Sequence, residues 1–193
     1  MADSTINTAY MILFDRWPGV AKRTNYADMP SAWVTPTVTA TYPMGEKICM
    51  WNSLRTTILG INGWTTFVYL RLGTQGTTIV AGDLVVPCLA TDIYRVSNDA
   101  TGGTTPALDA IGSPLAAIAL SAVTNDYYAW FWCGGVAPTW HAAAVGGTTP
   151  TADGVVIGLL GAVTAATGTN ETVPGPIAAD TTAPIGYTLK DDG

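Results

Sequence analysis

The chain has 193 residues, of which 48% are hydrophobic and only 11% are charged, and its formal net charge is −6. This length suffices for one domain of ordinary size, or for one domain with an arm. A typical soluble domain carries about 25% charged residues, so we interpret the neutral surface as one that partners cover; a Thr-rich soluble domain is the alternative. An acidic chain without a basic stripe lacks the charge pattern of a nucleic-acid-binding protein.

Residues 1–40 differ from the rest of the chain. They contain three prolines and five large aromatic residues, and they show neither the period of a strand nor that of a helix. Such a stretch predicts an extended N-terminal arm that lies on a surface. The alternative is an N-terminal strand and loop packed on the main domain. Residues 41–193 then form the β-domain.

From about residue 41 the sequence is typical of β-structure. Segments rich in β-branched and aromatic residues alternate with turn signals roughly every 8–12 residues, which is the spacing of a sandwich or a barrel. Strands are expected at 47–51, 65–72, 79–80, 84–89, 92–97, 115–123, 127–133, 155–160 and 187–189. Short helices would fit only at 116–123 and 139–145. We therefore predict an all-β protein, with a β-sandwich or β-barrel domain and an extended N-terminal arm.

A short sequence occurs twice within the predicted β-domain. Gly-Gly-Thr-Thr-Pro stands at 102–106 and again at 146–150, and an Ile-Gly step follows each copy. One interpretation is a weak hairpin duplication around 102–112 and 146–158. The other is convergence in a chain rich in Gly and Thr.

The chain offers little for catalysis. His141 is the only histidine, so any Ser/His/Asp or Cys/His site would have to use it, and its neighbours are Trp140 and three alanines. The three cysteines are widely spaced, which argues against a disulfide framework or a zinc site and predicts three buried thiols. No glycine motif for nucleotides occurs, and the longest apolar runs are too short to span a bilayer. We predict no enzymatic activity, no catalytic residue, no metal, no cofactor and no membrane contact.

Seven tryptophans are the most unusual chemical feature of the sequence. Trp and Tyr supply large contact areas and dominate interface hot spots, and they also stack on sugar rings. Strand alternation in residues 127–133 places three large aromatic residues on one face. The predicted interface residues are Tyr10, Phe14, Trp17 and Trp33 of the arm, and Tyr128, Trp130 and Trp132 of this strand. The alternative is that both faces of the strand are buried, in a sandwich or between subunits.

The stretch 111–136 (IGSPLAAIALSAVTNDYYAWFWCGGV) carries a recognisable pattern. It consists of an Ile-Gly step, a run of small apolar residues, a short polar turn and an aromatic strand that ends at Gly. This pattern resembles that of the capsid decoration (cement) proteins of tailed bacteriophages, and residues 183–189 (APIGYTL) look like the same Ile-Gly strand repeated.

The resemblance implies a structural virion protein, made in the host cytoplasm and placed on the outer capsid surface. It implies that the β-domain bridges neighbouring subunits of the major capsid protein and stabilises the phage head. Self-association is implied as well, with a homotrimer favoured. The alternative is a phage-surface or tail-fibre binding module that recognises host glycans through exposed aromatic residues.

Overall fold

The computed structural model describes residues 10–25, 35–52, 63–73, 79–89, 92–97, 115–137, 156–160, 175–178 and 184–190. Within these ranges the protein is all-β, so the fold class is confirmed to that extent. The strands are β1 (Tyr10–Leu13), β2 (Lys22–Asn25), β3 (Lys47–Asn52), β4 (Gly63–Leu72), β5 (Leu84–Leu89), β6 (Asp92–Ser97), β7 (Ala117–Ala119), β8 (Tyr128–Ala137), β9 (Val156–Leu160), β10 (Gly175–Ala178) and β11 (Pro184–Lys190). No helix able to span a membrane occurs among the described residues.

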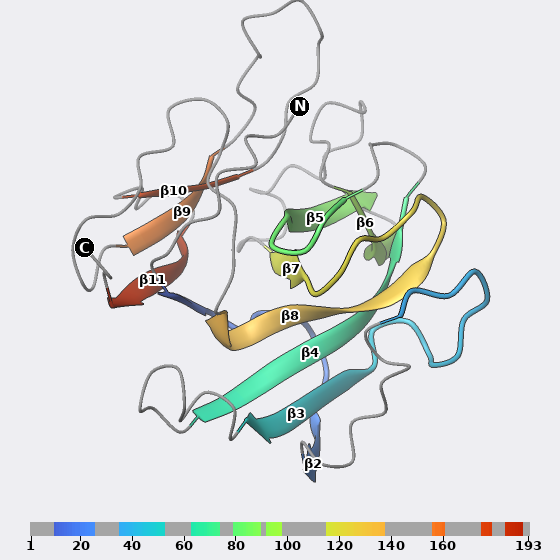
Figure 1. Cartoon of the computed structure of the whole chain (residues 1–193), viewed down its shortest axis with the longest axis horizontal. Helices are drawn as coiled ribbons and strands as arrows, with labels where there is room; N and C mark the ends of the chain where they lie inside the picture. Colours follow the sequence, from blue (N-terminus) through green and yellow to red (C-terminus); the bar gives the residue numbers. More distant parts are fainter. Residues whose placement is uncertain are drawn as a thin grey trace, which may run out of the picture.

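Five of the strands close into a barrel, in the order β4-β8-β7-β5-β6 and back to β4 (Figure 1). The long strands β4 and β8 run antiparallel, and Val68 lies opposite Phe131. The barrel closes where the end of β4 pairs in parallel with β6, with Leu72 opposite Val96. Of the two architectures expected from the sequence, the structure shows the barrel, and a sandwich is not confirmed.

Side-chain alternation on β4 and β8 fills the barrel. Val68, Leu70 and Leu72 of β4 point inward and pack with Ala129 and Phe131 of β8 in one buried cluster. The period of two in both strands produces this arrangement, because every second side chain faces the same way. The alternation expected for residues 127–133 is therefore confirmed.

The outer face of the same two strands holds a second cluster, built mainly from aromatic residues. Tyr69 and Trp130 lie at its centre, 2% exposed each, and the β3 residues Ile48 and Met50 pack against them. Tyr42 closes the cluster with edge-on contacts to both central rings. On the outer face of β8, Trp130 is buried, whereas Tyr128 and Trp132 are only partly buried, so the alternative of burial on both faces is confirmed in part.

The remaining strands extend the sheet beyond the barrel on both sides. On one side β3 pairs with β4, and β2 runs parallel to β3. On the other side β1 pairs with β8, and β11, β9 and β10 follow in that order (Figure 1). β1 therefore lies between β8 and β11.

The extended N-terminal arm is not confirmed by the described part of residues 1–40. β1 and β2 are both hydrogen-bonded into the sheet, and Trp17 belongs to the barrel core. This is the arrangement of an N-terminal strand and loop packed on the main domain. The two Gly-Gly-Thr-Thr-Pro copies lie outside the described residues, so the proposed duplication stays a prediction.

Candidate functional site: the N-terminal segment and the exposed aromatic residues

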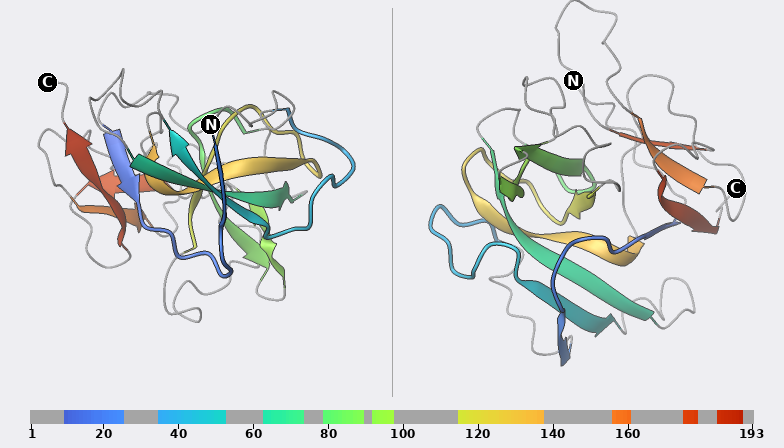
Figure 2. Two further views of the ribbon diagram at one scale, coloured as in Figure 1. Left: turned by 90° about the horizontal axis from the view of Figure 1, so that it is seen from below. Right: turned by 180° about the vertical axis from the view of Figure 1, so that it is seen from behind.

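Residues 14–21, called the N-terminal segment below, join β1 to β2. The trace of this segment crosses β8 and β4 (Figure 2). It passes so close to β8 that a Cβ built on Gly134 would lie 2.6 Å from the Cβ of Asp15. Glycine at this position therefore permits the close approach of the two backbones.

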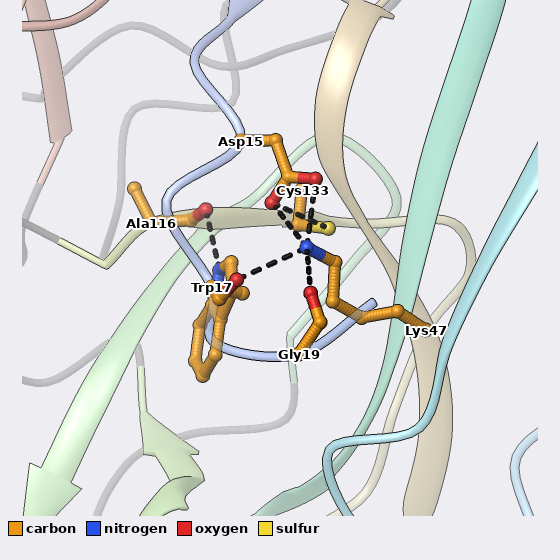
Figure 3. A network of polar contacts seen from close by, with 6 residues as sticks. All are labelled: Asp15, Trp17, Gly19, Lys47, Ala116 and Cys133. Carbon is orange, nitrogen blue, oxygen red and sulfur yellow. Dashed lines mark hydrogen bonds and ion pairs between the residues drawn. The ribbon is translucent and has the colours of Figure 1, made fainter. Parts of the chain in front are cut away.

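A buried lysine fastens the N-terminal segment to β3 (Figure 3). The side chain of Lys47 is 5% exposed, and its Nζ lies 2.8 Å from Oδ2 of Asp15. The same ammonium group donates hydrogen bonds to the carbonyl oxygens of Trp17, at 3.0 Å, and Gly19, at 3.5 Å. A buried ammonium needs such a set of oxygen partners, because removal from water is costly without them.

The Trp17 side chain fastens the same segment to the barrel. Its indole N–H donates to the carbonyl oxygen of Ala116 at 3.0 Å, and its ring stacks against Tyr94 of β6 at 6.3 Å between centroids. Trp17 is 3% exposed. Lys47 thus joins the N-terminal segment to β3, and Trp17 joins the same segment to the barrel.

Cys133 borders this network, and its environment keeps the thiol neutral. Burial is the main cause that raises the pKa of Cys133 well above its ordinary value, and the negative charge of Asp15 adds to the effect. Its Sγ lies 4.0 Å from Oδ1 of Asp15. A thiol held in its protonated form is a poor nucleophile and a poor metal ligand, so the network has the chemistry of a structural contact.

The other two cysteines differ from each other in burial. Burial also raises the pKa of Cys88, whereas Cys49 is only half-buried. The expectation of buried thiols is therefore confirmed for two of the three residues. No three His, Cys, Asp or Glu side chains gather as metal ligands in the described ranges, and His141 lies outside them.

Two of the residues predicted for an interface are core residues. Trp17 and Trp130 are 3% and 2% exposed, so neither offers a surface to a partner. Alternation along a strand does not reveal the packing that buries them. Trp17 packs in the barrel core, and residues of β3 together with Tyr42 cover Trp130. This corrects their assignment as contact residues.

The other predicted interface residues have mixed positions. Tyr128 and Trp132 are partly buried at the margin of the outer aromatic cluster. Phe14 is 36% exposed, and the guanidinium of Arg16 lies 5.5 Å from its ring centroid. Tyr10 is the first residue of β1, and Trp33 lies outside the described residues.

The sequence prediction missed the two tryptophans that are most exposed among the described residues. Trp51 and Trp64 are 39% and 42% exposed, and they lie directly opposite each other on β3 and β4. Their rings meet edge to face at 5.5 Å, and the guanidinium of Arg23 lies 5.1 Å from the Trp64 ring centroid. Trp51 ends one expected strand and Trp64 directly precedes the next, and an antiparallel hairpin of the two strands would bring these positions together. This position in the sequence was the signal that could have identified the pair.

The N-terminal segment also exposes an aliphatic side chain. Val20 is 94% exposed, between Gly19 and Ala21. Because Lys47 binds the carbonyl oxygens of Trp17 and Gly19, the backbone next to Val20 is held in place.

Comparison of the chain with protein-family models, with curated proteins and with solved structures found no match.

Proposed function

We propose that the protein is a structural virion protein, a capsid decoration protein that bridges neighbouring major capsid subunits on the outer surface of a phage head. One observation carries the proposal: a chain with only 11% charged residues displays large apolar side chains on a rigid β-scaffold. The exposed large hydrophobic residues are Phe14, Val20, Val38, Met44, Trp51, Trp64 and Val80. The resemblance of residues 111–136 to cement proteins supports the same role.

The N-terminal segment is the surface best suited to the capsid. Val20 is almost fully exposed, and complete burial of such a side chain contributes about 1.5 kcal/mol. The segment is already held by Lys47 and Trp17, so little conformational entropy is lost when a partner covers it. Attachment of a self-associated trimer at several points of a lattice multiplies this modest affinity.

In this role the protein makes and breaks no covalent bonds and uses no cofactor or metal. Its partners are the major capsid protein and further copies of itself, and it binds neither nucleic acid nor membrane. Its place is the outer surface of the virion.

The copy number in purified particles that contain the chain tests the proposal. We expect hundreds of copies per particle, measured by quantitative mass spectrometry against the major capsid protein. A dozen copies or fewer would place the chain at the neck or the tail and would refute a decoration role.

A pair of variants then tests the contact surface. Val20→Ser removes the most exposed aliphatic side chain of the N-terminal segment, and Val38→Ser is the matched control at a position 67% exposed outside it. We expect Val20→Ser to weaken binding to undecorated heads by about tenfold and Val38→Ser to leave it unchanged. Equal occupancy of both variants would show that the N-terminal segment does not bind the capsid.

A second candidate function is a phage-surface or tail-fibre module that recognises host glycans. The exposed pair Trp51 and Trp64 is the specific observation that favours it. Low copy number together with glycan binding would favour this module over the decoration protein.

A further inference from the structure

Trp51, Trp64 and Arg23, called the Trp51–Trp64 site below, lie together on one face of the sheet. The two indole planes meet at 73°, with their centroids 5.5 Å apart, so the rings contact each other edge to face and form one continuous aromatic surface. The site is at the end of the β3–β4 ribbon that lies farthest from β5 and β6 (Figure 1). Arg23 reaches it from β2, where it lies beside Cys49 of β3.

The backbone beneath Trp64 is fixed. Gly135 of β8 has φ +82, and a Cβ at this position would collide with the carbonyl oxygen of Trp64. The glycine therefore lets the backbone of β8 lie close beside the start of β4. Because the strands hold the backbone, the aromatic surface is largely formed before any ligand arrives, which lowers the entropic cost of binding.

The exposed area of the two tryptophans fits a small ring better than a protein. A tryptophan side chain presents up to about 250 Å², so exposed fractions of 39% and 42% leave about 200 Å² on the pair. A stable protein interface buries about 800 Å² on each partner. The pair alone is therefore too small for a protein contact, and its area matches that of one or two sugar rings.

The positive charge of Arg23 further restricts the kind of ligand that the site would bind. Among the described residues, no carboxylate pairs with the Arg23 guanidinium, in contrast to Lys22, which is 2.7 Å from Glu46. A guanidinium presents five N–H donors in a planar fork that matches a carboxylate. Sugar rings present apolar C–H faces to an indole and hydroxyl groups at their rim, and acidic sugars add the carboxylate.

We propose that the Trp51–Trp64 site binds a saccharide that carries a carboxylate. One sugar ring stacks on the exposed indole surface, and the carboxylate pairs with Arg23. The inference specifies the ligand class of the second candidate function, and it does not depend on capsid binding.

Isothermal titration with oligogalacturonate tests the proposal, with the methyl-esterified oligomer of the same length as the neutral control. We expect the acidic oligomer to bind more tightly than the ester, by about tenfold, and the difference to shrink as salt concentration rises. Trp51→Ala and Trp64→Ala should each weaken binding of both oligomers by about tenfold or more. Arg23→Gln should remove the preference for the acid while binding of the ester remains.

Arg16→Gln is the matched control, because Arg16 also lies over an aromatic ring, at 5.5 Å from that of Phe14, but belongs to the N-terminal segment. It should leave the titrations unchanged, and circular dichroism should show that every variant is folded. Equal affinity for acid and ester, unchanged binding by both tryptophan variants, or no binding at millimolar oligomer overturns the proposal.

Head occupancy separates this inference from the decoration role. Trp51→Ala should bind heads normally and lose the saccharide, whereas Val20→Ser should do the reverse. Loss of head binding by Trp51→Ala with saccharide binding intact would identify the site as a protein contact and refute the inference.

Discussion

Replacement of Lys47 by methionine removes the ammonium group that joins β3 to the N-terminal segment and keeps the length of the side chain. The Nζ atom lies 2.8 Å from Asp15 and donates to the carbonyl oxygen of Trp17 at 3.0 Å. The substitution leaves the carboxylate without its cation and the carbonyl oxygen without its donor. We expect the free energy of unfolding to fall, because unpaired polar groups in a partly buried site are poorly solvated.

The size of the effect depends on burial. Removal of one partner from a fully buried ion pair costs about 3–5 kcal/mol. The Asp15 side chain is 30% exposed, so water can solvate part of the abandoned charge. We therefore expect Lys47→Met to lower the free energy of unfolding by about 2 kcal/mol.

A second lysine provides a matched control. Lys22 lies 2.7 Å from Glu46, a distance almost equal to that of the buried pair, but its side chain is 75% exposed. Exposed ion pairs contribute about 0–1 kcal/mol, so Lys22→Met should have an effect at the lower end of this range. The two variants differ in burial and share the chemistry of the substitution.

Urea unfolding, followed by circular dichroism, measures these free energies. A double-mutant cycle of Lys47→Met with Asp15→Asn isolates the pair, and we expect a coupling energy of about 1–2 kcal/mol. If Lys47→Met and Lys22→Met destabilise the protein equally, or if the coupling is close to zero, the Lys47 network does not hold the N-terminal segment in place.

Four further results are expected. Gly135→Ala should lower the free energy of unfolding by about 2–3 kcal/mol in urea titrations, because φ is +82 and the new Cβ meets the Trp64 carbonyl oxygen; an unchanged midpoint would contradict the close approach. At pH 8 a thiol reagent should modify Cys49 in the native protein and Cys133 only after unfolding. Because the folded pKa of Cys133 is raised above the ordinary 9.0, its contribution to stability is complete below about pH 9 and is lost as the pH rises further; stability that increases above pH 9 would contradict this sign. Trp17→Phe removes one buried hydrogen bond and should cost about 1–2 kcal/mol in the same titrations, whereas a neutral result would place the indole outside the core.

The sequence predicts the strands of the barrel well, because each carries its own signal. β5 (Leu84–Leu89) and β6 (Asp92–Ser97) have the predicted limits, and a turn signal at residues 81–83 precedes the apolar run of β5. The alternation on β8 also predicts which residues share a face, because side chains of a strand alternate with a period of two.

β1 and β2, which lie outside the barrel, could not be predicted from their own residues. β2 has the polar sequence KRTN, and it is a strand because β3 offers it a parallel edge. β1 has an apolar sequence without alternation, and its pairing depends on strands far away in the chain. Local patterns contain no information about such partners.

The burial or exposure of the candidate site residues likewise could not be predicted from local sequence patterns. The burial of Trp17 depends on Ala116, 99 positions further along the chain. The exposure of Trp51 and Trp64 depends on the register of β3 and β4 and on the extension of this ribbon beyond the barrel. The residue type predicted that tryptophans take part in contacts. Only the three-dimensional arrangement shows which of them are buried in the core and which are exposed.

The position of β1 between β8 and β11 has a consequence for the way the protein opens. Among the described strands, this four-residue element is the sheet's hydrogen-bonded connection between the barrel and the group β11, β9 and β10. Detachment of β1 frees an edge of both neighbours at once, so the outer three strands should separate from the barrel as one cooperative unit. Their amide protons should therefore exchange with solvent together with those of β1, while the barrel strands keep their protection.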